Sequence, residues 1–233
     1  MSFVGNYLPS RVLAKLDSYR NSGLDCRASV ELAKLGLKFL PWTVSAMRPS
    51  AVFSLVNEII INKRKTVLEF GSGISTLYLS KAAEMIGGTV ISIEDNPVWA
   101  SLVSDMLKAE GLSSVGQVLV ATLQECSYSL DSSVWYDTDI VSRAVAGSKI
   151  DLVVVDGPRA HTRDLAHARY PALPVVYPHL SPRCAVVLDD ISRSGERHII
   201  KRWEADSELK FDQLAARGGY AIARRGDYFV SSI

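Results

Sequence analysis

The fold of this 233-residue chain is indicated most clearly by the segment Thr66-Val67-Leu68-Glu69-Phe70-Gly71-Ser72-Gly73-Ile74-Ser75-Thr76. Residues 66–70 are typical of a short buried strand, and the glycines that follow allow a tight turn with close access to the backbone. The next segment has its apolar residues at helical spacing, at Leu79, Ala82, Ala83 and Ile86. A strand, a glycine loop and a helix in this order indicate the opening unit of a ligand-binding α/β sheet.

Similar units follow toward the carboxyl terminus. We expect further strands at residues 89–94, 117–121, 151–155, 184–188, 210–214 and 220–224, with helical segments between the earlier ones. Strands that alternate with helices indicate a mostly parallel sheet covered on both faces. No helix separates the last two strands, which predicts an antiparallel pair at the end of the chain.

The amino-terminal part has a different character. Apolar spacing there predicts helices near Leu8 to Leu16, from Val30 to Leu40, and from Ser50 to Ile59, with Ser50 as a cap. We therefore expect residues 1–60 to form a helical extension or lid, and residues 61–233 to form the main domain. The extension could also provide a homodimer contact.

Composition restricts the class of protein. The net charge of +1 argues against a dedicated nucleic-acid binder, and the basic run Lys63-Arg64-Lys65 is typical of a solvated turn. No apolar run approaches the ~20 residues of a membrane span, and the first residues do not resemble a signal peptide. An odd number of cysteines, three, suits a reducing compartment. We expect a cytoplasmic protein without membrane or nucleic-acid partners.

Acidic residues follow four of the expected strands. Glu69 and Glu94 end the first two, Asp156 follows the fourth, and Asp189 and Asp190 follow the fifth. Because ligands bind at the carboxyl ends of strands in such sheets, these acids should converge on one crevice.

The glycine loop favours one ligand class over another. Thr76 stands where a dinucleotide fingerprint requires its third glycine. Glu69 would not favour a pyrophosphate, but it would suit a ligand with a cationic amino group and a sulfonium. Glu94 lies roughly 20 residues further on, the spacing of a carboxylate that binds ribose hydroxyls. Taken singly, the loop could be a plain turn and Glu94 a solvated charge.

Four segments together resemble a known family. Val67–Gly73, Ile93–Glu94, Asp151–Pro158 and Val187–Asp190 are similar to the motifs of class I S-adenosylmethionine-dependent methyltransferases. More narrowly, they resemble bacterial small-molecule O-methyltransferases of the catechol and macrocin type, over about residues 50–225. The resemblance implies a doubly wound, seven-stranded Rossmann-like α/β sheet of order 3-2-1-4-5-7-6 with the last strand antiparallel.

The resemblance also implies a cofactor site. Glu69 and the loop would face the methionine moiety of S-adenosylmethionine, Glu94 would hold the ribose, and Thr122 would lie near the adenine. The full set of expected cofactor-binding residues is Glu69, Gly71, Ser72, Gly73, Ser75, Thr76, Glu94, Thr122 and Asp156.

Metal-dependent members of the family place acids as this chain places Asp156, Asp189 and Asp190. Oxygen ligands suit Mg²⁺, which could acidify an acceptor hydroxyl. Three carboxylates in one crevice would also repel one another without a cation. The alternative is that Asp156 touches only cofactor and Asp189 caps the next helix.

The expected general base departs from the family pattern. Relatives carry lysine or histidine where this chain has Arg159, which stays protonated at neutral pH. His161 lies two residues further and has a suitable pKa, although a loop histidine can be a bystander. We therefore take His161 and Arg159 as candidate catalytic residues, with Arg159 alternatively holding an anionic substrate.

The long stretch from Thr122 to Lys149 is a further candidate, because such loops are usually functional. In it, Trp135 and Tyr136 could flank the adenine, line the acceptor pocket, or form a small satellite core. Altogether the sequence predicts a methyltransferase acting on a small-molecule hydroxyl with Mg²⁺ assistance. The alternatives are a metal-free transferase for another nucleophile and a non-catalytic cofactor-binding protein.

Overall fold

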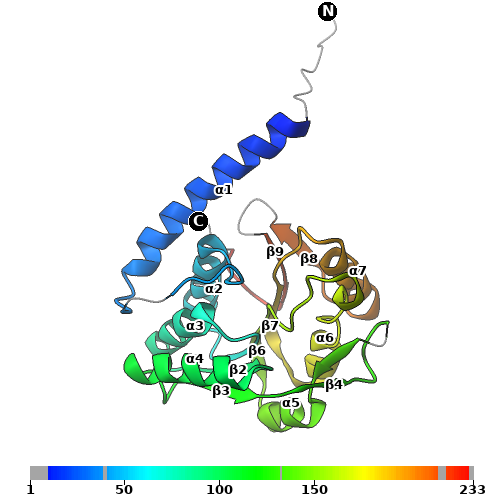
Figure 1. The fold of residues 1–233 in the computed structure, drawn as a ribbon. Helices are drawn as coiled ribbons and strands as arrows, with labels where there is room; N and C mark the ends of the chain where they lie inside the picture. Colours follow the sequence, from blue (N-terminus) through cyan, green and yellow to red (C-terminus); the bar gives the residue numbers. More distant parts are fainter. Residues whose placement is uncertain (1–9, 39–40, 132, 215–218, 231–233) are drawn as a thin grey trace, which may run out of the picture.

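The computed structural model describes residues 10–38, 41–131, 133–214 and 219–230, with only the backbone for residues 10–21. Its centre is a seven-stranded sheet of order β3-β2-β1-β6-β7-β9-β8 (Figure 1). The strands are β1 (Thr66–Phe70), β2 (Thr89–Glu94), β3 (Gly116–Val120), β6 (Ile150–Val155), β7 (Leu180–Leu188), β8 (Phe211–Leu214) and β9 (Tyr220–Arg225). β9 runs antiparallel to β7 and to β8, and the other pairings of this sheet are parallel, which confirms the predicted order and the antiparallel last strand.

Hydrogen bonds align the carboxyl ends of the central strands. The backbone N–H groups of Asp156 and Gly157 both donate to the Phe70 carbonyl, at 2.9 and 2.7 Å. The Asp189 N–H donates to the Val155 carbonyl at 3.0 Å. The residues that follow β1, β6 and β7 therefore begin at the same level of the sheet.

Helices cover both faces of the sheet (Figure 1). One face packs against α2 (Pro49–Asn62), α3 (Ile74–Met85) and α4 (Pro97–Ala109), and the other against α5 (Thr138–Val145), α6 (Ala172–Val176) and α7 (Ser194–Asp206). Alternate residues of β6 enter the two cores, as the period of a strand requires. The smaller elements are a hairpin of β4 (Leu123–Glu125) and β5 (Val134–Tyr136) and the 3₁₀ turns η1 (Arg163–Leu165) and η2 (Tyr177–His179).

The amino-terminal helices differ in part from the prediction. A single helix, α1 (Ser10–Ala33), extends from the body of the molecule (Figure 1). It ends well before Leu40, so the predicted helix from Val30 to Leu40 is wrong; Leu8, residues 39–40 and the side chains of 10–21 lie outside the described residues.

Ser50 is not the cap of α2. The N-cap is Arg48, and the Ser50 hydroxyl instead donates to Asp25 Oδ1 at 2.5 Å, which ties α2 to α1. The helix itself is part of the core, because Ala51 and Ile59 are fully buried beside α3. None of the helices in the described part of the chain is both long and apolar enough to cross a membrane.

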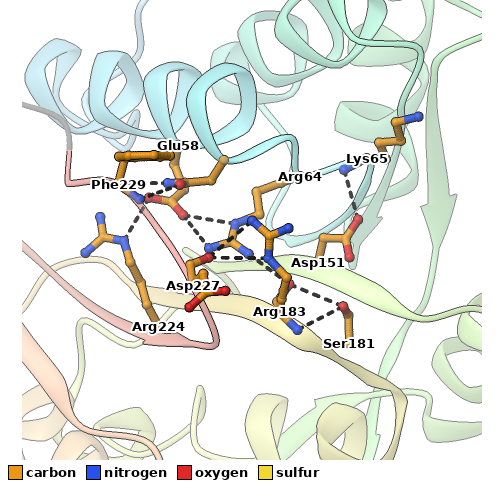
Figure 2. Close-up of polar contacts among 10 residues, drawn as sticks. Glu58, Arg64, Lys65, Asp151, Ser181, Arg183, Arg224, Asp227 and Phe229 are labelled. Atoms are coloured by element: carbon orange, nitrogen blue, oxygen red, sulfur yellow. Dashed lines mark hydrogen bonds and ion pairs between the residues drawn. The ribbon is translucent and has the colours of Figure 1, made fainter.

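A buried ion-pair network attaches α2 to the amino edge of the sheet (Figure 2). Glu58 accepts hydrogen bonds from Arg64 Nε at 3.0 Å and from Arg224 Nε at 2.9 Å. Arg64 also donates to the Arg183 carbonyl at 2.8 Å. We call Glu58, Arg64 and Arg224 the Glu58 cluster. Arg64 is only 1% exposed, so the prediction of a solvated turn is wrong for this residue.

Candidate active site

A cavity of about 470 Å³ opens at the carboxyl edge of the sheet. Ends of β1, β2, β6 and β7 contribute to its wall, as does the segment from Pro41 to Met47. Most of the predicted site residues line it together, namely Gly71, Ser72, Gly73, Ser75, Glu94, Asp156, Arg159, His161, Asp189 and Asp190. Among these ten residues, Arg159 and His161 are the exposed ones. Thr122 is exposed and is not part of the cavity wall.

The two loop glycines have different reasons to be glycine. Gly71 has a φ of +92°, and a Cβ added there would lie 2.8 Å from the Gly157 nitrogen. This glycine is therefore required by contact with the loop after β6. Gly73 has extended backbone, and an added Cβ would meet no atom within 4 Å. Since Gly73 lines the cavity, its missing side chain leaves space for a ligand.

Glu69 lies beneath the glycine loop and is not part of the cavity wall. Its carboxylate accepts hydrogen bonds from Ser75 Oγ at 2.6 Å and Thr76 Oγ1 at 2.5 Å. Thr76 Oγ1 in turn accepts from the Gly73 N–H at 3.0 Å. Complete burial raises the pKa of Glu69 to about 6, although the two hydroxyls act in the opposite direction. In this arrangement, Glu69 and Thr76 shape the loop from below.

Glu94 lines the cavity and is held by the same loop. Its Oε2 accepts from the Ser72 N–H and hydroxyl, both at 2.9 Å, and its Oε1 accepts from the Asn96 N–H at 3.0 Å. Trp99 Nε1 donates to the Ser72 carbonyl at 2.7 Å, which fixes the loop from its other side. A carboxylate fixed in this way is suited to accept hydrogen bonds from a diol.

The acids that follow β6 and β7 also line the cavity. Asp156, Asp189 and Asp190 each offer an oxygen within 4.8 Å of the others. Burial, and then repulsion by Asp189, raises the pKa of Asp156 well above its usual value. Burial and repulsion by Asp190 raise the pKa of Asp189 to about 7. With Glu196, which is fully buried at the start of α7, we call these residues the acid cluster.

Sequence reasoning missed the cations of this cluster. Arg169 is 3% exposed, and its Nη1 lies 3.0 Å from Asp190 Oδ2 while its Nη2 lies 3.4 Å from Asp156 Oδ1. Arg193 pairs with Asp190 at 3.0 Å and with Glu196 at 3.3 Å. Burial lowers the pKa of Arg169, but the surrounding carboxylates raise it overall, so it is a permanent cation. No local pattern around residue 169 distinguishes it from a surface arginine.

The aromatic pair belongs to the main core of the sheet, so the alternative of a small satellite core is wrong. Trp135 and Tyr136 pack against Phe70, with ring centroids 5.2 and 5.7 Å away, and form part of the core. Tyr136 also lines the cavity, and its buried hydroxyl has no hydrogen-bond partner among the described residues.

The sequence matches a protein family over this part of the chain. Residues 68–191, more than half of the molecule, fit the family model of a methyltransferase domain. The chain belongs to this family, which confirms the predicted class, an S-adenosylmethionine-dependent class I methyltransferase. No curated protein sequence matches it.

Solved structures share the fold at low identity. The methyltransferase PaMTH1 of Podospora anserina, bound to SAH, is 12% identical with a TM-score of 0.65, over 96% of this chain and 100% of that one. An O-methyltransferase of Bacillus cereus in complex with SAH is 14% identical with a TM-score of 0.58, over 91% and 97%. TomG of Streptomyces achromogenes, an O-methyltransferase of tomaymycin synthesis in complex with SAM, is 16% identical with a TM-score of 0.57, over 91% and 96%.

Proposed function

We propose that this protein transfers a methyl group from S-adenosylmethionine to a hydroxyl of a small molecule. The observation that carries the proposal is one cavity whose lining combines two kinds of groups: the glycine loop with Glu94 and Asp156, and then Asp189, Asp190 and His161. Two O-methyltransferases of the same fold were solved with SAH or SAM. These relatives support the choice of cofactor and of reaction.

The first group of lining residues would hold the cofactor. The segment Gly71–Gly73 and Ser75 would contact the methionine moiety, and Glu94 would accept hydrogen bonds from the ribose. Asp156 would complete this side of the site. Glu69 and Thr76 would act through the loop that they support, because neither lines the cavity. Thr122 follows β3 at the same edge of the sheet, and its proposed place near the adenine is at the periphery.

The other group of lining residues would hold the acceptor. The acceptor oxygen forms a bond to the methyl carbon while the carbon–sulfur bond breaks, and the electron pair leaves with sulfur as SAH. His161 would take the hydroxyl proton on a ring nitrogen, since imidazole is the side chain that most often serves as a general base. Arg159, exposed in the lining of the same cavity, would hold an anionic group of the acceptor.

Magnesium assistance stays a prediction that this charge balance does not favour. The oxygens of Asp156, Asp189 and Asp190 are of the type that Mg²⁺ prefers, and a bound ion would acidify the hydroxyl. Two of these three carboxylates, however, already pair with Arg169 or Arg193. The residues therefore do not fit a divalent ion well, and the proposed transfer uses side chains alone.

The proposed lid is shorter than residues 1–60. Thr43 to Met47 line the cavity, whereas α2 is built into the core. We expect deletion of residues 1–40 to leave a folded domain with altered acceptor affinity; loss of folding would show that α1 completes the core. A homodimer contact through α1 would appear as a halved molar mass of the truncated chain in light scattering. The free thiols of Cys26, Cys126 and Cys184 suit the proposed cytoplasmic setting.

Calorimetric titration with S-adenosylmethionine and SAH tests the cofactor site. Glu94→Ala should weaken binding by about 1–3 kcal/mol, because ribose hydroxyls lose a buried acceptor. Gly73→Val should abolish binding without unfolding the chain, since the new side chain points into open space. Gly23→Val is the matched control, because an added Cβ at this α1 glycine also meets no atom within 4 Å. Equal binding by Gly73→Val and the control would contradict the assignment.

A methyl-transfer assay tests the acceptor class. Phenols, sugars and amines are offered with labelled S-adenosylmethionine, with and without Mg²⁺, and products are identified by mass. Formation of methyl ethers supports the proposal, whereas methylation of amines alone would favour transfer to another nucleophile. Cofactor binding with no turnover on any acceptor would favour a non-catalytic cofactor-binding protein.

A further inference from the structure

The acid cluster contains a cation of its own. Its members come from three places: Asp156 follows β6, Asp189 and Asp190 follow β7, and Glu196 lies in α7. Arg169, from the segment between η1 and α6, reaches into their midst. We propose that Arg169 occupies the place of a divalent ion in this cluster, so that the protein binds none there and transfers methyl groups without one. The part of this inference that concerns methyl transfer rests on the proposed function, but the test of metal binding does not.

The guanidinium contacts acids from all three places. Its Nη1 lies 3.0 Å from Asp190 Oδ2 and 3.8 Å from Glu196 Oε1, and its Nη2 lies 3.4 Å from Asp156 Oδ1. A planar group with several fixed donors can bridge carboxylates in this manner, much as a metal ion gathers its ligands. Arg169 is therefore a positioning residue that sets where Asp156 and Asp190 lie.

The side chain is anchored as well as paired. Arg169 Nε donates to the Pro158 carbonyl at 3.1 Å, and Nη1 donates to the Asp189 carbonyl at 3.5 Å. Only 4% of the side chain is exposed, although Arg169 is among the residues that line the cavity. These contacts hold the charge at the cluster, in contrast to the surface position of an ordinary arginine.

Arg169 and a divalent ion would compete for the same oxygens. An ion held by Asp156 and Asp190 would lie beside the guanidinium, because both carboxylates already contact it. Like charges at such separations repel strongly in a buried site. Asp189 is the member with no ion pair to an arginine in the described part of the chain, and it is also among the residues that line the cavity.

Titration with Mn²⁺, followed by electron paramagnetic resonance, tests the inference on the full chain without cofactor or acceptor. We expect no Mn²⁺ bound at the cluster of the wild-type protein. Arg169→Gln removes the positive charge, and the variant should bind Mn²⁺ at the cluster at least about tenfold more tightly than the wild-type protein does, equivalent to about 1.4 kcal/mol. The gained site should disappear in the double variant Arg169→Gln, Asp189→Asn. Arg202→Gln is the matched control, because Arg202 forms an exposed pair with Asp206 on α7, at 3.6 Å.

Each outcome decides. Mn²⁺ bound by the wild-type protein and lost in Asp189→Asn would overturn the inference. A folded Arg169→Gln variant that binds no Mn²⁺, or binds it equally well with Asp189→Asn, would also overturn it. If Arg169→Gln does not fold, the wild-type titration alone decides in the same two directions. None of these results depends on turnover, so failure of the proposed function would appear separately, in the methyl-transfer assay.

Discussion

A buried group of charges lies at each end of the parallel strands, which we call the amino edge and the carboxyl edge of the sheet. The two groups differ in their ratio of acids to cations. At the amino edge, the Glu58 cluster sets one carboxylate between Arg64 and Arg224 (Figure 2). At the carboxyl edge, the acid cluster sets four carboxylates around Arg169 and Arg193. The first group is closed off among α2, β7 and β9, and the second opens onto the cavity.

The difference shows that buried charge alone does not mark a functional site. In the Glu58 cluster, cations outnumber the acid, and hydrogen bonds satisfy both carboxylate oxygens. In the acid cluster, burial and then the surplus of carboxylates raise the pKa values of Asp156 and Asp189. Such perturbed groups in a cavity are the usual mark of a site that does chemistry.

We expect the largest loss of stability when the acid of the Glu58 cluster is removed. Glu58→Ala leaves Arg64 and Arg224 buried without their shared acid, which should lower the free energy of unfolding by about 3–5 kcal/mol. Urea denaturation measures this change, and S-adenosylmethionine binding per folded molecule should be unaffected. Glu31→Ala is the control, because Glu31 forms a solvent-exposed pair with Lys34 that contributes about 0–1 kcal/mol. Equal losses in the two variants would show that the Glu58 cluster does not hold α2 in place.

Local sequence patterns predict the sheet well, and they also predict the acidic residues of the cavity lining. The apolar runs at β1, β2, β6 and β7 are continuous because these strands are buried on both faces, so their ends can be located from sequence. Parallel strands bring their carboxyl ends to one edge, which is why Glu94, Asp156 and Asp189 meet as predicted.

The remaining features depend on contacts between distant segments. Arg169 reaches the acid cluster only through the path of the chain after β6, and Arg64 is buried only because α2 lies over the sheet edge. Both are charged residues that local patterns assign to the surface. Gly71 has a recognisable motif, but the neighbour that requires it, Gly157, lies on another strand end. The sequence argument for Mg²⁺ assumed that the three carboxylates have no cation of their own. This assumption is wrong, because the sequence does not reveal that Arg169 is buried among them.

Glu69 is a further buried acid, and its partners are hydroxyls rather than arginines. Its pKa is raised from 4.5 to about 6, so between these values the native state binds a proton more tightly than the unfolded state. Its contribution to stability is therefore complete below about pH 4.5 and is lost as pH rises through 6, by about 2 kcal/mol. Glu69→Gln cannot ionise. Unfolding free energies measured from pH 4 to 7.5 should show the wild type losing this amount relative to the variant.

The exposed Glu84→Gln provides the control for this pH series, because Glu84 pairs only with Lys81 at the surface. Its difference from the wild type should vary little over the same range. A constant difference between the wild type and Glu69→Gln would mean that Glu69 ionises as easily in the fold as in water, and that its hydroxyl partners fully replace a cation.

The smallest effect has the opposite sign and lies in the acid cluster. Asp189→Asn keeps the size of the side chain and can still accept a backbone hydrogen bond, but removes one surplus charge. It should raise the free energy of unfolding by about 0.5–2 kcal/mol, as substitutions that relieve a strained site commonly do. The pKa of Asp189 is raised from 3.8 to about 7, so the gain should be present at pH 8, where the wild-type carboxylate is ionised, should shrink as the pH falls through 7, and should vanish only below about pH 4. Turnover should fall in the same variant while cofactor binding persists.

Asp212→Asn, on the exposed side of β8, is the control for loss of a carboxylate. If Asp189→Asn instead destabilised the protein as Glu58→Ala does, the acid cluster would carry no surplus charge, and the contrast between the two edges would not hold.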